Sequence, residues 1–196
     1  MDGLHFKYNE YMRLDQCTVE YTFSDGSSVS VRFTESGFLH LLGLHKLVDI
    51  QDIQFWQDKN NRKVHADDVI RKIKNEQLTE TTIKSSVFFT KIADRYNSFT
   101  YDNLTTLAYT DAIIDFDATK IKSKLLSDYI LFEERPAGEY NHLGIAKDNK
   151  TNKRYFETFI HDKSQGYLLN QKIVKIKSMT IYDPSGNTIV ADSFEK

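Results

Sequence analysis

The sequence predicts an α+β fold, with an N-terminal β-hairpin and helices packed on a C-terminal antiparallel sheet. Two β-branched and aromatic runs flank an Asp-Gly turn within residues 16–33, which indicates a hairpin. Helical periodicity dominates 36–99, and strand-like runs separated by turn residues occupy 112–190. Helices first and strands later are typical of α+β proteins. We expect a single domain over 1–196, with 1–15 as an N-terminal arm.

Composition limits the classes of protein that need considering. The chain has 196 residues, 40 % of them hydrophobic, which is enough for one domain with a real core. Its formal charge of −2 gives no overall basic field, so a nucleic acid would have to bind a local patch. A lone cysteine, Cys17, and the lack of a signal segment or membrane-spanning run predict a cytoplasmic protein without membrane contact. We expect no cofactor and no metal ion.

The first element after the arm is the hairpin. Polar residues alternate with apolar ones along both strands, which predicts that each strand has one solvent-exposed face. We therefore expect the hairpin to lie over a core. The densest apolar run follows at 38–47, and it carries His40, His45 and Lys46. A segment that is apolar nearly all round predicts a buried helix, which we expect to end near Val48. In a regular helix the two histidines would lie about 140° apart, so they could not bind one metal together.

Two more helices are predicted in the helical part. The first covers 65–78, with acidic residues early and basic residues late, as the helix dipole favours. The second begins after a cap at Thr79 or Thr81 and runs to about Tyr96. Arg95 falls on its core-facing stripe, which is unusual for an arginine. It is either a structural group at the helix end or a ligand for phosphate.

The C-terminal part predicts five strands. Strict alternation along the fourth would place Glu157 on one face and Thr158 on the other. The strands are expected at 112–116, 129–133, 140–147, 154–161 and 172–182.

No motif of a nucleotide-binding fold, a zinc protease or a serine hydrolase is present. What remains is a dispersed group of histidines, cations and hydroxyls of the kind that cleaves RNA without a metal. In that reaction one group takes the proton of the ribose 2′-OH, another protonates the leaving oxygen, and a cation with a hydroxyl holds the phosphate. The group comprises His40, Lys46, Arg95, His142, Arg154, Glu157, Thr158 and Tyr167.

Several of these residues also have ordinary structural interpretations. His40 would be a hydrogen-bonded core histidine, and Thr158 simply a good strand former. Glu157 would be a surface carboxylate and His142 an exposed histidine on a strand.

The block His40-Leu-Leu-Gly43-Leu-His45-Lys46-Leu47, preceded by Phe38, resembles a known family pattern, an aromatic residue followed by H-L-x-G-L-H-K-L. The family is the fourth group of phage-associated barnase–EndoU–colicin–RelE-like nuclease domains. The resemblance spans most of 20–182. Its later matches are Asp94-Arg95, the strand 128–132, Thr158 ahead of an aromatic residue, and Tyr167 followed by Gln171.

The resemblance implies a compact nuclease-like domain of phage or mobile-element origin that cleaves RNA as a metal-independent endoribonuclease. It makes His40 the acid/base group, Arg95 the cation and Thr158 the hydroxyl at the phosphate. The family more often has Pro-x-Ser ahead of the aromatics; here Glu157-Thr158 keeps a hydroxyl and adds a negative charge. We expect substrate contacts from Lys46, His45, Arg154, Glu157 and Tyr167.

Three hypotheses follow from the sequence. The leading one is a ribonuclease-like effector, such as a toxin, or a mobile-element protein that acts on RNA, with either a protein partner or an immunity protein. The alternative is a catalytically silent binding module that acts on a host protein or small ligand through the same cleft, which mild acidity and Glu157 favour. The third is a structural domain in which the histidine-rich helix is only core. A positive, open cleft around His40 would favour RNA. The sequence predicts no oligomeric state.

Overall fold

The computed structural model describes residues 2–54, 65–105, 109–149 and 151–193. Within these ranges the chain forms short helices and an eight-stranded antiparallel sheet, which confirms the α+β class. The helices are α1 (Gly3–Met12), α2 (Gly37–Leu42), α3 (Gln51–Gln54), α4 (Ala66–Lys74), α5 (Glu80–Lys84), α6 (Ala93–Ser98) and α7 (Tyr101–Thr105). The strands are β1 (Thr18–Phe23), β2 (Ser28–Arg32), β3 (Asp111–Ile114), β4 (Ser127–Arg135), β5 (Glu139–Lys147), β6 (Arg154–Asp162), β7 (Lys172–Tyr182) and β8 (Thr188–Ser193).

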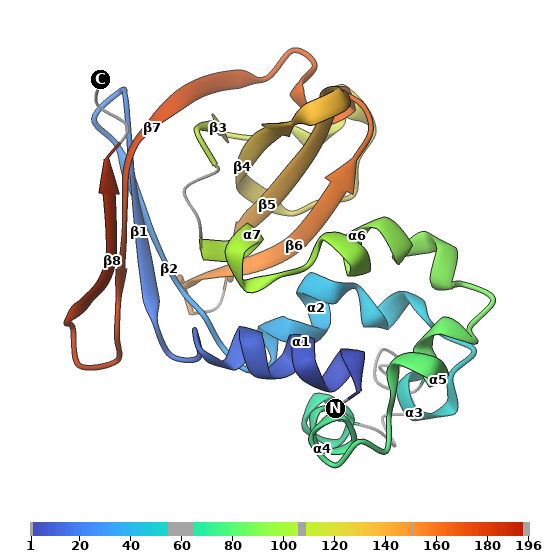
Figure 1. The fold of residues 1–196 in the computed structure, drawn as a ribbon. Coiled ribbons are helices and arrows are strands. Elements are labelled where there is room, and N and C mark those ends of the chain that lie inside the picture. Colours follow the sequence, from blue (N-terminus) through green and yellow to red (C-terminus); the bar gives the residue numbers. More distant parts are fainter. Residues whose placement is uncertain (1, 55–64, 106–108, 150, 194–196) are drawn as a thin grey trace.

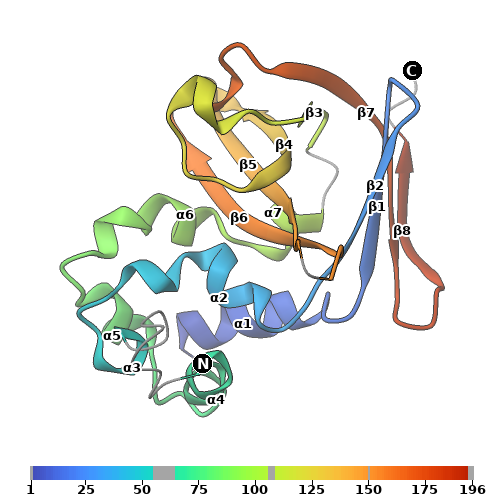
Figure 2. The ribbon, with the colours of Figure 1, turned by 180° about the vertical axis from the view of Figure 1, so that it is seen from behind.

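The sheet has the order β2-β1-β7-β3-β4-β5-β6, with β8 paired to β7. The first part of β7 pairs with β3 and its later part with β1, and the sheet curls at this point into two walls (Figures 1 and 2). The five predicted C-terminal strands are confirmed, with ends that differ by two residues at most.

The predicted hairpin is formed by β1 and β2. Alternate residues of both strands are buried, as the pattern indicated. In the turn, the Asp25 carboxylate accepts hydrogen bonds from the amide and hydroxyl of Ser27, and Gly26 adopts a left-handed φ of 86°. These buried residues belong to the main core, so the hairpin lies over the core as expected. The hairpin extends the sheet edge to edge, with Thr18 opposite Tyr182, because β7 is long enough to pair with both walls.

The central helix is shorter than predicted. It ends at Leu42 instead of near Val48, because Gly43 takes a left-handed φ of 74° and caps it. A 3-10 turn, η1 (Leu44–Lys46), follows in a new direction. The residues on either side of Gly43 therefore do not follow one helical wheel.

The predicted helix from Thr79 to Tyr96 is also interrupted. Its cap at Thr79 is confirmed, since the Thr79 hydroxyl accepts a hydrogen bond from the Thr82 amide in the first turn of α5. The chain leaves α5 early because the Asp49 carboxylate accepts hydrogen bonds from the Ser86 hydroxyl and the Val87 amide. A 3-10 turn, η2 (Phe89–Lys91), then leads into α6.

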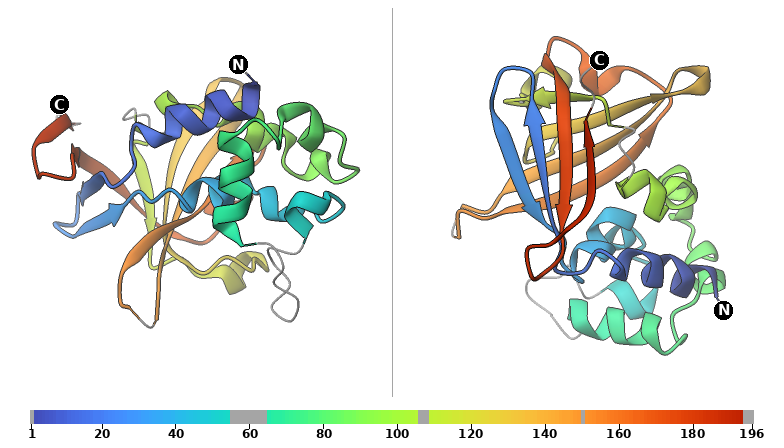
Figure 3. Two further views of the ribbon diagram at one scale, coloured as in Figure 1. Left: turned by 90° about the horizontal axis from the view of Figure 1, so that it is seen from below. Right: turned by 60° about the vertical axis from the view of Figure 1, so that its left-hand side comes forward.

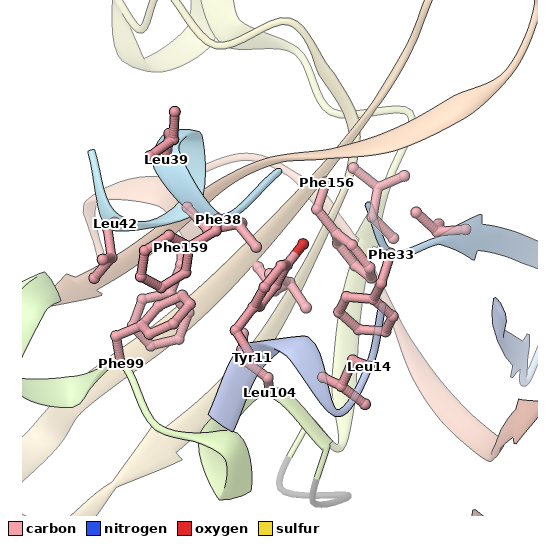
Figure 4. Packing of buried hydrophobic residues seen from close by; sticks show 14 of the residues in the cluster. Tyr11, Leu14, Phe33, Phe38, Leu39, Leu42, Phe99, Leu104, Phe156 and Phe159 are labelled. Carbon is pink, nitrogen blue, oxygen red and sulfur yellow. The ribbon is translucent and has the colours of Figure 1, made fainter. Parts of the chain in front are cut away.

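The helices gather on one side of the sheet, next to the edge strand β6, as Figure 3 shows. Buried aromatic residues join them to that strand (Figure 4). Phe99 lies 5.8 Å from Phe38 of α2 and 5.8 Å from Phe159 of β6, and Phe33 lies 4.6 Å from Phe156, measured between ring centroids. This core continues from α1 to β7, and we propose on that basis that the chain is one domain.

Candidate active site

A hollow with a volume of about 520 Å³ lies between α2, α6 and β6. We call it the central cavity. It is open to solvent on one side, and residues from five separate stretches of chain meet there. They are His40, His45, Lys46, Thr90, Lys91, Asp94, Arg95, Ser123, Lys124, Leu125, Glu157, Thr158, Ile160, His161 and Tyr167.

All but two of the residues singled out from the sequence line this cavity. They are His40, His45, Lys46, Arg95, Glu157, Thr158 and Tyr167. One exception is His142, which is described below, and the other is Arg154, at the start of β6. Its guanidinium pairs with Asp128 at 3.0 Å and lies 4.7 Å from the centroid of the Tyr129 ring.

Arg95 is the most unusual of these residues, because only 8 % of its surface is exposed. Burial lowers the pKa of its guanidinium to about 10, while the nearby Tyr167 opposes that change. The guanidinium fits because Gly43 has no side chain: a Cβ there would lie 2.7 Å from Arg95 Nη1. Within the described ranges it forms neither a hydrogen bond nor an ion pair. A buried cation without a counter-ion favours an anionic ligand.

Further cations surround Arg95. The pKa of Lys46 is lowered to about 8, first by its burial and then by the positive charges of Arg95 and Lys91. Counting ionised side chains on the cavity wall gives four cations, from Lys46, Lys91, Arg95 and Lys124, against two carboxylates, from Asp94 and Glu157. The cavity is therefore locally positive in a chain whose net charge is −2.

The two histidines are brought together by the break at Gly43. Their ring centroids lie 5.8 Å apart, which a regular helix would not allow. His40 is open to solvent, so the core interpretation of this residue was wrong. Desolvation still lowers its pKa, and Glu157 raises it in opposition. Burial lowers the pKa of His45 to about 4, with His40 and Lys46 adding to the effect.

A β-bulge explains why Glu157 and Thr158 face the same cavity. Thr158 pairs with Gly144 and Phe156 with Ile145, so Glu157 is an extra residue in β6. The prediction that strict alternation separates the two was wrong for this reason. A Cβ at Gly144 would lie 2.9 Å from Thr158 Cγ2, so the glycine leaves room for the threonine.

The carboxylate of Glu157 is held by the first residue of β4 and the residue before it. It accepts hydrogen bonds from the Leu126 amide at 2.9 Å and from the Ser127 hydroxyl at 2.6 Å. Glu157 is thus a fixed part of the wall and not a free surface carboxylate.

Sequence reasoning missed His161, Lys91 and Lys124 as lining residues. His161 follows Thr158 by three positions on β6, a spacing that carries little signal across a bulge. Its Nδ1 shares a hydrogen bond of 2.9 Å with the Asn141 side chain, and its Nε2 lies 3.3 Å from Glu139. Both ring nitrogens therefore have protein partners.

His142, expected to be exposed, is in fact buried. It lies in a second, smaller core cluster, with the rings of Phe132, Tyr140 and Tyr167 around it. Neither ring nitrogen has a hydrogen-bond partner within the described part of the chain. Burial lowers its pKa to about 4.

In the described ranges, no three histidine, cysteine or acidic side chains come together as a metal ion requires. Nor does any helix there have the length and apolar character needed to cross a bilayer.

Comparison with known proteins gives a match to a protein family. The model of the family described as phage-Barnase-EndoU-ColicinE5/D-RelE like nuclease4 matches residues 6–193. No curated protein and no solved structure matches. The family match covers nearly the whole chain, including every residue of the central cavity. The chain therefore belongs to the phage-Barnase-EndoU-ColicinE5/D-RelE like nuclease4 family.

Proposed function

We propose that the protein is a metal-independent ribonuclease that cleaves RNA through attack of a ribose 2′-hydroxyl on the adjacent phosphate. The observation that supports this best is the buried guanidinium of Arg95, which lines the same cavity as His40 and Thr158. The substrates of a nuclease family contain phosphate, an anion that a guanidinium binds well. The phage association of the family supports RNA of a bacterial host as the substrate, with an immunity protein as partner.

The acid and base follow from the two pKa shifts. His40, whose pKa is lowered, is neutral at pH 7 and takes the proton from the 2′-hydroxyl. The 2′-oxygen then bonds to phosphorus and the bond from phosphorus to the 5′-oxygen breaks. Lys46, with a pKa of about 8, is protonated at pH 7 and donates a proton to that 5′-oxygen. The products are a 2′,3′-cyclic phosphate and a free 5′-hydroxyl.

The remaining residues hold charge in place. The Arg95 guanidinium and the Thr158 hydroxyl donate hydrogen bonds to the phosphate oxygens, where negative charge grows. Glu157 stabilises His40 after it has taken up the proton, since its carboxylate raises the pKa of that imidazole. His45 and Tyr167 contact the bound substrate.

The test is cleavage of RNA by the purified protein and by two variants, His40→Gln and Arg95→Ala. We expect each to lower kcat/KM by about a hundredfold or more, the usual effect of removing an acid–base group or a charge-stabilising group. Wild-type cleavage should persist in EDTA. Expression of the wild type, but not of His40→Gln, should inhibit bacterial growth.

His65→Gln is the matched control, because His65 is exposed and lies outside the cavity. An oligonucleotide with 2′-deoxyribose at the cleaved position should resist the enzyme. The proposal is wrong if the wild type cleaves no RNA and its expression is harmless, and binding without cleavage would then support the silent binding module.

A further inference from the structure

A second hollow, of about 380 Å³, adjoins the central cavity, and His40 lines both. Its wall includes Arg32 from β2 and the ring of Tyr155 from β6, which is 38 % exposed. Hydroxyls of Thr34 and Ser36 line it as well. This second hollow therefore offers an accessible aromatic face, one guanidinium and hydrogen-bonding groups directly beyond the residue proposed as the base.

A third hollow, of about 460 Å³, continues from the second, and Arg32 lines both. Its other cations are Lys153 and Arg154, and none of its described lining residues is acidic. Arg154 pairs with Asp128 and lies over the Tyr129 ring, while Arg32 donates a hydrogen bond of 3.3 Å to the Gln16 carbonyl. This end of the surface is positive.

The three hollows follow the direction of β6. Arg154 lines the third hollow, Tyr155 the second, and the residues from Glu157 to His161 the central cavity. At about 3.3 Å per residue, Arg154 and His161 lie roughly 23 Å apart, a length that exceeds one nucleotide. Figure 1 shows β6 running from β2 towards α6, with both α2 and β2 packed against it.

We propose that the three hollows form one groove for single-stranded RNA. The strand leaves the cleaved phosphate, passes His40, stacks one base on Tyr155 and places the next phosphates against Arg32, Lys153 and Arg154. Exposed aromatic rings interleaved with cations are the usual surface for a single strand, because every base has a face that stacks. This proposal rests on the ribonuclease function proposed above.

The test compares uridylyl-uridine with hexauridylate as substrates. Tyr155→Ala should raise KM for the hexanucleotide by about five- to a hundredfold, the range expected for loss of one stacked base. The dinucleotide, which reaches only the central cavity, should be cleaved as by the wild type. Tyr155→Phe should retain wild-type KM, and kcat should change in neither variant.

Arg32→Ala tests the charged part of the groove. The affinity for fluorescein-labelled hexauridylate should depend less steeply on salt than in the wild type. The slope of log K against log salt concentration should be smaller in magnitude by about 0.7, the value for one phosphate contact on a single strand. Arg71→Ala is the matched control, because Arg71 is exposed on α4 and lines none of the three hollows.

A fully 2′-O-methylated hexauridylate separates this proposal from the ribonuclease function, since it binds but cannot be cleaved. If the wild type cleaves no RNA but binds this probe in a manner that depends on Tyr155 and Arg32, the groove stands and the ribonuclease proposal fails. If the wild type cleaves RNA while both variants match it on the hexanucleotide, the groove is overturned. Failure to bind the probe at all overturns it too.

Discussion

At the scale of single residues, the site combines groups whose protonation is set by burial. Arg95, Lys46 and His45 all lose solvent at the cavity, and each has a lowered pKa for that reason. Only Arg95 stays charged at any ordinary pH, which suits a residue that holds a phosphate. The pKa of Lys46 is lowered to about 8 and that of His40 lies below its ordinary value, so at pH 7 the lysine can give a proton and the histidine can accept one.

The first residue-scale prediction concerns the pH profile of RNA cleavage. Activity should rise as His40 loses its proton, at a pH below its ordinary value of 6.5, and fall as Lys46 loses its own near pH 8. Lys46→Arg should shift the alkaline limb upwards by more than one pH unit, because arginine stays protonated. Lys74→Arg is the control, because Lys74 is exposed on α4 and does not line the cavity. An alkaline limb that does not move in Lys46→Arg would remove Lys46 from the role of acid.

The second concerns His142 and stability. Its pKa is about 4 in the folded chain against 6.5 for an ordinary histidine, so the unfolded chain binds the extra proton between these values. Stability from this residue is complete above pH 6.5 and is lost as pH falls towards 4. At pH 5 the loss is about 2 kcal/mol relative to pH 7.

His142→Phe should remove that loss and raise the free energy of unfolding at pH 7 by about 1 kcal/mol, since two unpaired buried nitrogens disappear. Urea unfolding at pH 7 and pH 5 measures both effects, and His142→Leu serves if phenylalanine overfills the site. A variant with the same pH dependence as the wild type would show that His142 is not the group responsible.

At the scale of elements, the break after α2 and the bulge in β6 create the site. Gly43 turns the chain so that His40 and His45 approach, and its lack of a side chain admits Arg95. The bulge turns Glu157 and Thr158 towards the same space. Each of these two features interrupts a regular helix or strand at one residue. Such local irregularities are common at functional sites.

Gly43→Ala tests the first of these features. The added Cβ would collide with Arg95 Nη1, so we expect kcat/KM for RNA to fall by about tenfold or more and stability by about 1 kcal/mol. Gly26→Ala is a closely matched control, because Gly26 also has a left-handed φ but has nothing within 4 Å of the added Cβ. Similar activity losses in both variants would mean that backbone strain alone is responsible.

At the scale of the whole molecule, the sequence predicted the strands well and the helices less well. Alternating residues and turn signals report strands locally, and 172–182 was predicted to the residue. The helical breaks depend on tertiary contacts, such as the capture of Ser86 by Asp49, that no local pattern contains.

The same division holds for the site. The block from His40 to Lys46 was visible in the sequence because its residues are contiguous. That Lys91 and Lys124 line the same wall depends on how distant segments pack, and periodicity carries no such information. Arg154 was selected for its residue type and strand, but its direction depends on the Asp128 and Tyr129 beside it.

The curl of the sheet has a consequence for biosynthesis. Because β7 pairs with both β1 and β3, the two walls cannot be joined until β7 has been made, long after β1 has left the ribosome. Tyr167, just ahead of β7, completes the cavity equally late. On the proposed function, such an enzyme would remain inactive on the nascent chain while most of its own message is being translated.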